Sequence, residues 1–171
     1  MEHAKTLLKN GTIVDGTGAP PRRGSVLLEN GAQVLLPADA RVAGARELDC
    51  QARVIAPGFI DVHSHMDFFA VSDRPEDFQA FAAQGITSMV VGNCGFSPFG
   101  FQCDSPHQGL IENGLFKAGH DRSDWHDFSG YRAQIERHGP VQNLVSLVGH
   151  GTCRTSLHGF EAGQLSAGIK F

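Results

Sequence analysis

Two histidines separated by one residue stand at the end of an apolar, β-branched run that includes a Pro57-Gly58 turn. Because the side chains of a strand alternate between its faces, His63 and His65 are expected to point the same way, with Cα atoms roughly 6–7 Å apart. Two imidazoles at that distance can close on one metal ion or on a metal pair. The alternative is a pair of satisfied histidines at a strand end, and for the isolated motif that alternative is the better interpretation.

A following strand supplies a third candidate ligand. Residues 86–91 form a near-continuous apolar run, the kind that is buried on both faces of a parallel sheet. Cys94 comes just after this run, 29 residues beyond His65, and one strand–helix–strand step takes about 30 residues. We therefore expect Cys94 beside the two histidines, at the carboxyl ends of neighbouring strands. Two imidazoles and one thiolate form a borderline-soft donor set that favours Zn²⁺ over Mg²⁺ or Ca²⁺.

The elements that position these residues follow a strand–helix–strand pattern from Arg53 onward. Residues 75–84 are predicted to form a helix between the first two strands. Ser72 or Asp73 is the expected N-cap of this helix, and Gly85 is expected to end it.

A second helix and a third strand are predicted further along. Apolar residues recur at a helical period over 125–138, and residues 141–148 form another strand-like run. His150 comes just past that strand, in the position that Cys94 takes after the strand before it. Active sites of α/β barrels are built at the carboxyl ends of the strands, which is where these side chains are expected.

The stretch 95–124 carries glycines and prolines, shows no clear period and is predicted to be a long loop. His107, His120 and His126 lie in it or at its edge. These three histidines lack the spacing of metal ligands, so we assign them to a solvated loop.

Residues 1–52 are predicted to form a small antiparallel β unit. Short apolar runs are separated by Asn10-Gly11, by Asp15-Gly16 and by Asn30-Gly31, and such dipeptides between apolar runs are strong hairpin signals. On its own the unit is too short for a stable sandwich, so it is expected to need further strands.

The composition is that of a soluble globular protein. The 171 residues are 41% hydrophobic and 19% charged, with a net charge of −4, so nothing favours a nucleic-acid partner. No signal peptide and no apolar run of membrane-spanning length is evident, so we expect a cytoplasmic protein without a membrane partner. The four cysteines form no CxxC pair and are interpreted as reduced thiols.

Several of these segments carry a family resemblance. Residues 57–65, Pro-Gly-Phe-Ile-Asp-Val-His-Ser-His, resemble the first barrel strand of the amidohydrolase superfamily. Residues 92–98, 148–154 and 9–18 resemble the D-aminoacylase branch, the N-acyl-D-amino-acid deacylases, and the Gly-Asn-Cys-Gly element is the most discriminating part. The resemblance implies an α/β fold in two domains. Residues 1–52 would be part of a small β-sandwich domain, and residues 53–171 the first three to four units of a (β/α)8 TIM-type barrel.

The resemblance also implies a reaction and its cofactor. The family hydrolyses the amide bond of N-acyl-D-amino acids to a carboxylate and a free D-amino acid, with one or two Zn²⁺ ions. In that setting His63 and His65 hold the more exposed metal, and the Cys94 thiolate bridges to, or holds, the tightly bound ion. His150 and Arg154 match the third-strand motif and would help to shape the substrate end.

One part of the family site is not found in the sequence. The family completes its site with two histidines and a catalytic aspartate from later strands, and the general base is expected beyond residue 171. Asp61, Asp67 and Asp73 do not match that base and are interpreted as capping or surface residues. We therefore expect an N-terminal portion (a fragment, a truncated gene or one piece of a split enzyme) that is inactive alone. It would associate with the missing C-terminal half or with another copy.

Two other functions stay open at this point. Other amidohydrolase branches bridge two metals with a carboxylated lysine on the fourth strand, and residues 168–171 resemble that setting around Lys170. The enzyme would then favour cyclic amides such as hydantoins or dihydroorotate. The other alternative is a non-catalytic, truncated remnant that binds metal.

Overall fold

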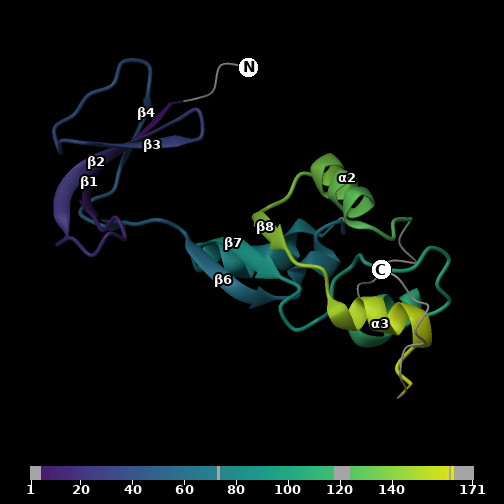
Figure 1. The fold of residues 1–171 in the computed structure, drawn as a ribbon. Helices are drawn as coiled ribbons and strands as arrows, with labels where there is room; N and C mark the ends of the chain where they lie inside the picture. The colour runs from purple at the N-terminus through teal and green to yellow at the C-terminus, as the bar shows by residue number, and fades with distance from the viewer. Residues whose placement is uncertain (1–4, 73, 118–123, 162, 164–171) are drawn as a thin grey trace. The chain divides into compact units, whose positions relative to one another are not determined.

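The computed structural model describes residues 5–72, 74–117, 124–161 and 163, and the chain divides into two compact units, residues 1–57 and residues 58–171 (Figure 1). Among the described residues, the first unit carries a five-stranded sheet and the second a three-stranded sheet. The strands are β1 Thr6–Ile13, β2 Arg22–Glu29, β3 Ala32–Leu36, β4 Arg46–Asp49, β5 Val54–Ile55, β6 Phe59–Ser64, β7 Ile86–Val91 and β8 Asn143–Ser146. The helices are η1 Met66–Phe69, η2 Pro75–Phe78, α1 Gln79–Ala83, η3 Leu110–Leu115, α2 Phe128–His138 and α3 His150–His158. No helix in the part of the chain that is described is long and apolar enough to cross a membrane.

The first sheet is mixed, which corrects the prediction of a purely antiparallel unit. Its strand order is β3-β2-β1-β4, and β5 also pairs with β1. The pairs β1–β2 and β2–β3 are antiparallel, whereas β4 and β5 run parallel to β1. The prediction failed because β4 is only four residues long, Arg-Glu-Leu-Asp, with three charged residues and none buried, so the sequence did not mark it as a strand.

Two of the predicted hairpin dipeptides differ from each other in structure. Asn30-Gly31 forms the expected tight turn between β2 and β3, and both residues have the positive φ that such turns require, 52° and 75°. Asn10-Gly11 instead lies inside β1, where the pairing register with β2 shifts between Leu8 and Gly11. Asn10 has a φ of 58°, so the left-handed residue makes a bulge there and not a chain reversal.

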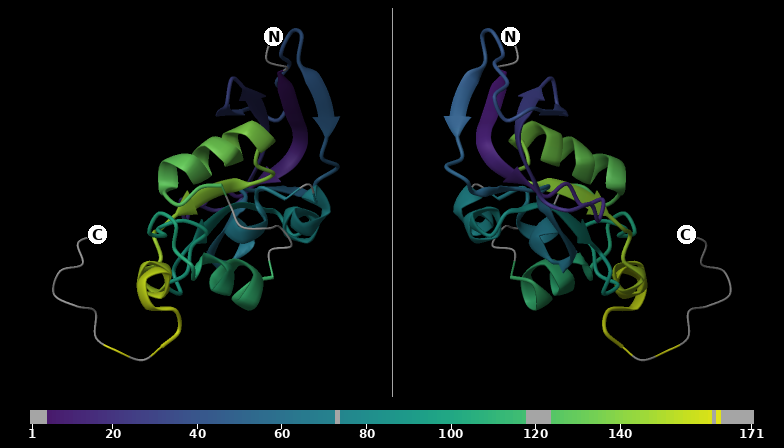
Figure 2. Two further views of the ribbon diagram at one scale, coloured as in Figure 1. Left: turned by 90° about the vertical axis from the view of Figure 1, so that its right-hand side faces the viewer. Right: turned by 90° about the vertical axis from the view of Figure 1, so that its left-hand side faces the viewer.

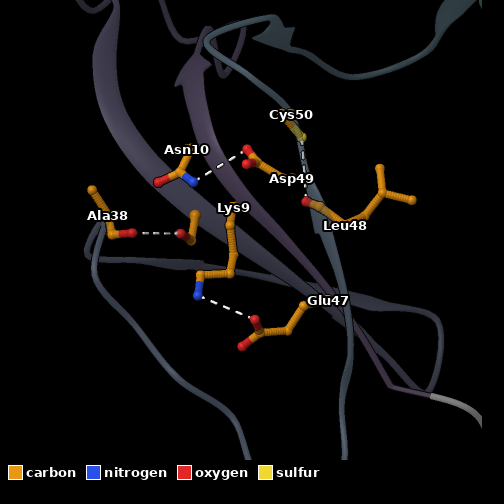
Figure 3. A network of polar contacts seen from close by, with 8 residues as sticks. Lys9, Asn10, Ala38, Glu47, Leu48, Asp49 and Cys50 are labelled. Atoms are coloured by element: carbon orange, nitrogen blue, oxygen red, sulfur yellow. Dashed lines mark hydrogen bonds and ion pairs between the residues drawn. The ribbon is translucent and has the colours of Figure 1, made fainter.

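Polar side-chain pairs link β1 to its parallel neighbour β4 (Figure 3). The Lys9 ammonium lies 3.2 Å from a carboxylate oxygen of Glu47, and the Asn10 amide donates to Asp49 at 3.1 Å. Figure 3 shows both pairs bridging the two strands. The bulge therefore turns the Asn10 side chain towards the edge strand, where it hydrogen-bonds to Asp49.

The second sheet is parallel throughout and has the order β6-β7-β8, as the sequence predicts. The third strand is shorter than the predicted 141–148 and spans Asn143–Ser146. The β6–β7 register shifts between Asp61 and Ser64, just where the two histidines begin. Figure 1 shows α3 beyond the arrowheads of β6 and β7, and the turned views of Figure 2 show it well apart from α2.

Both predicted helices form, the first with its predicted start at residue 75 and the second with a shifted start. The first begins as the 3-10 turn η2 and continues as α1; Arg74 is its N-cap residue, and Ser72 makes no capping bond. The other proposed cap, Asp73, lies outside the described residues. Helix α2 begins three residues later than predicted, because the Asp127 carboxylate accepts a hydrogen bond from the Gly130 N–H at 2.8 Å and caps it there.

The sheet of the second unit is covered unevenly. Phe78, Met89 and Val91 are buried together in one hydrophobic cluster. Other large apolar side chains of the sheet and the segments next to it are exposed: Phe59, Ile60, Val62, Val141, Val145, Leu147 and Val148, each at least 46% exposed. We call this set as a whole the exposed apolar face, whichever side of the sheet each residue lies on. Nothing among the described residues covers it.

Candidate metal centre

The three predicted ligands come together at the carboxyl ends of β6 and β7. One ligand atom from each of His63, His65 and Cys94 lies within 4.8 Å of the others, and the described residues contain no second such group. The Cys94 sulfur is 3.5 Å from Nε2 of His65, and the two imidazole ring centres are 5.5 Å apart. Cys94 is exposed and not in a disulfide, so its sulfur is available to a metal. The arrangement fits a zinc ion, which two imidazoles and a thiolate bind well.

Local hydrogen bonds fix the ends of the two strands. The Asp61 carboxylate accepts from the backbone N–H of His63 at 3.0 Å, a local bond within β6 that caps no helix. The side-chain amide of Asn93 donates to the carbonyl of Val62. Asn93 precedes Cys94 and Val62 precedes His63, so this bond ties the thiol's segment directly to that of the histidines.

Glycines bring the backbones after β7 and β8 into direct contact. Gly92 has a φ of 86°, and a Cβ there would lie 2.2 Å from the carbonyl oxygen of Leu147. A Cβ on Gly149 would lie 2.5 Å from the carbonyl oxygen of Gly95. Only glycine permits such approaches. The glycines of the two family-like motifs, Gly-Asn-Cys-Gly and Gly-His-Gly, therefore set the distance between these segments.

Helix α3 is held against the segment after Cys94 by buried hydroxyls. The Ser97 N–H donates to the Thr152 hydroxyl at 2.8 Å, and that hydroxyl donates to the Ser97 carbonyl at 2.9 Å. His150 is the first residue of this helix, is exposed and is not in the ligand group. Arg154 is half-buried, and its guanidinium donates to the carbonyl of Gly163. Their predicted role at the substrate end stays a prediction.

An aromatic ring borders the ligand group. Phe116 follows the π-helix η3 within the stretch that was predicted to be a loop, and its ring centre lies 4.7 Å from that of His65. Burial lowers the pKa of His65, and the neighbouring His63 lowers it further. A lowered pKa favours the neutral imidazole, which is the form that binds metal.

Asp67 is a buried carboxyl near the site, which corrects its interpretation as a capping or surface residue. Its side chain is fully buried, and neither oxygen has a hydrogen-bond partner among the described residues. Burial raises the pKa of Asp67 to about 7. The nearby backbone N–H groups of Phe68 and of Asp67 itself lower this pKa in part, although they lie outside full hydrogen-bond geometry. The Tyr131 hydroxyl donates to the Asp67 carbonyl at 2.9 Å, and burial followed by the Asp67 charge raises the pKa of Tyr131.

The remaining candidate residues stand apart from this group. His107 and His126 are described and are not among the grouped ligands, and their assignment to a solvated loop stays a prediction. His120 and Lys170 lie outside the described residues.

Comparisons with known proteins identify the relatives of this chain. The chain is 35% identical over 168 residues to an N-acyl-D-glutamate deacylase of Alcaligenes xylosoxydans xylosoxydans, covering 98% of this chain and 33% of that protein. A crystal structure of N-acyl-D-glutamate deacylase from Bordetella bronchiseptica, complexed with zinc and a phosphonate inhibitor, matches with a TM-score of 0.72 and 30% identity over 91% of this chain and 31% of that one. A D-aminoacylase structure concerned with a binuclear metal centre matches with a TM-score of 0.67 and 30% identity, over 88% and 31%. No family model matches the chain.

The class of protein that these matches define is the amidohydrolases, of which D-aminoacylase forms a subset. Within that class, the relatives of this chain are N-acyl-D-amino-acid deacylases, which confirms the resemblance drawn from the sequence motifs. The chain spans about a third of the length of the curated relatives it matches.

Proposed function

We propose that this chain supplies the metal-binding part of a zinc-dependent hydrolase that cleaves the amide bond of N-acyl-D-amino acids. The observation that carries the proposal is the convergence of His63, His65 and Cys94 within 4.8 Å, in a chain homologous to N-acyl-D-amino-acid deacylases. A carboxylate and a free D-amino acid are the products of this reaction.

The residues of the site would have different roles in binding zinc and substrate. Zinc, when bound, polarises a carbonyl and lowers the pKa of water. The two histidines supply neutral donors, and Cys94 supplies the one anionic ligand of the set. The Asn93 bond to the Val62 carbonyl keeps the thiol beside the imidazoles. His150 and Arg154 are proposed to bind the substrate end, where a guanidinium can pair with the α-carboxylate of the substrate.

We further propose that the second unit is the start of a TIM-type barrel and the first unit part of a β-sandwich. Three parallel strands, with the ligand group at the carboxyl ends of the first two, match the way such barrels build active sites. The relatives are about three times as long as the matched segment, so barrel units beyond it would cover the exposed apolar face. The catalytic aspartate would come from those units.

Zinc titration tests the metal centre, with the two exposed cysteines as a matched pair. We expect about one equivalent of Zn²⁺ to bind weakly, because three protein ligands leave a tetrahedral shell incomplete. Cys94→Ser should reduce the affinity, whereas Cys103→Ser, which removes an exposed thiol outside the group, should not. Equal affinities in the two variants would refute the ligand assignment.

A further inference from the structure

The imidazole of His65 has no orienting hydrogen bond of the usual kind. A histidine that binds metal almost always donates its second ring N–H to a carboxylate, a carbonyl or water. Among the described residues, the ring nitrogens of His65 have polar contacts with the Cys94 sulfur alone, at 3.5 and 3.8 Å. The Cys94 sulfur and the His65 imidazole both belong to the proposed ligand set. Something other than a hydrogen bond from the described residues must therefore hold this ring.

The ring of Phe116 is placed to do so. It contacts His65 at a centre-to-centre distance of 4.7 Å with 43° between the planes, and it stacks on the buried Phe68 at 4.0 Å with 16° between the planes. Phe96 meets it edge-on at 5.9 Å. Because the Phe116 ring is packed on Phe68 and Phe96, it presents a fixed aromatic surface to the tilted imidazole.

The π-helix explains how Phe116 reaches this position. The Phe116 N–H donates to the carbonyl of Ile111, five residues earlier, at 3.0 Å. An α-helical turn would use one residue fewer and direct the next side chain roughly 100° away. Ile111 is fully buried and packs with Phe68 and Phe101, so the start of the turn is anchored in the same cluster as its end. Single π-turns of this kind are frequent at functional sites.

We propose that Phe116 is a positioning residue of the metal centre, holding the His65 imidazole by aromatic packing in place of the usual hydrogen bond. The proposal rests on the metal centre proposed above. It assigns a role to a residue that binds no metal and that lies in a segment without any ligand. A rigid ring in this position is what matters, so an aromatic replacement should preserve the role and an aliphatic one should not.

The experiment follows metal binding by the 171-residue chain with the metal ion alone. Zn²⁺ affinity is measured by competition with a chromophoric chelator, and Co²⁺ is added separately to record the visible absorption bands that report ligand geometry. Phe116→Leu is compared with Phe116→Tyr, which keeps the ring, and with Phe160→Leu, which changes an exposed phenylalanine away from the site. Phe116→Met provides a second flexible side chain in case the leucine variant fails to fold, as judged by its circular dichroism.

We expect the leucine and methionine variants to bind zinc about tenfold more weakly, the lower end of the roughly 10–100-fold loss found when an orienting partner of a ligand is removed. In the leucine and methionine variants the visible Co²⁺ bands that report ligand geometry should shift, while the cobalt–thiolate band should remain. The Phe116→Tyr and Phe160→Leu variants should match the unsubstituted chain in zinc affinity and in Co²⁺ spectrum. Unchanged affinity and bands in a folded leucine or methionine variant would overturn this inference alone. Absence of zinc binding by the unsubstituted chain would overturn the proposed metal centre and this inference with it.

Discussion

Replacing Gly92 by alanine should destabilise the second unit more than the same change at another glycine of positive φ. Gly92 has a φ of 86° and Gly139, at the end of α2, a φ of 79°, so alanine is strained at both positions. This strain costs about 1–2 kcal/mol. The difference lies in the space available: a Cβ on Gly139 meets nothing within 4 Å, whereas one on Gly92 lies 2.2 Å from the Leu147 carbonyl oxygen.

The clash adds a second cost at Gly92. A contact of 2.2 Å must open by roughly 1 Å, and the neighbour is backbone, which cannot rotate away as a side chain can. Overpacking of this kind costs about 1–3 kcal/mol. We therefore expect Gly92→Ala to lose about 2–5 kcal/mol of unfolding free energy and Gly139→Ala to lose about 1–2 kcal/mol.

Urea denaturation followed by fluorescence measures both losses. The chain has one tryptophan, and Trp125 lies in the second unit with its indole N–H bonded to the Pro98 carbonyl at 2.8 Å, so it reports on this unit. Because Cys94 is two residues beyond Gly92, the Gly92→Ala variant should also bind zinc more weakly, while the Gly139→Ala variant should not. Equal destabilisation by the two substitutions would show that the segments after β7 and β8 do not meet as described.

Three further predictions concern acid stability, activity and association. The Thr17 hydroxyl, Arg22 and the Thr17 N–H hold the pKa of Asp15 at about 2, below its usual 3.8. The contribution of Asp15 to the first unit's stability is therefore present above about pH 4 and is lost as the pH falls towards 2. Asp15→Asn should flatten acid unfolding over that window, and an unchanged curve would contradict the assignment. The 171-residue chain should not turn over N-acetyl-D-methionine, because the proposed function assigns the proton shuttle, worth about 10²–10⁴-fold, to an aspartate of further barrel units. Chelator-sensitive turnover would refute this. The purified chain should associate through the exposed apolar face, which light scattering detects, and a cooperatively melting monomer would contradict the partial-barrel proposal.

The ligand group could be predicted because its signals are local. An apolar strand places the two histidines, and the spacing to the next apolar strand places Cys94 beside them. The parallel order of β6, β7 and β8 follows from the same apolar runs. These features depend on alternation and chain length, which a sequence shows directly.

The parts that could not be predicted depend on contacts between distant segments. Asn10-Gly11 has the composition of a hairpin, and only its pairing with β2 on one side and β4 and β5 on the other makes it a bulge. The π-helix ending before Phe116 has no 3.6-residue period to detect. Asp67 has the composition of a surface residue, and its burial becomes apparent only when Phe68 and Tyr131 are packed beside it.

The exposure of Cys94 has a consequence for handling the protein. A free thiol at the surface is open to oxidation, first to sulfenic acid and then to irreversible acids, whereas a zinc-bound thiolate is protected. Cys50 is buried and serves as an internal reference for that reactivity. Zinc and oxidants thus compete for one sulfur atom. A preparation that no longer binds metal should first be reduced, because the lost capacity reflects the chemical state of Cys94 before it reflects the fold.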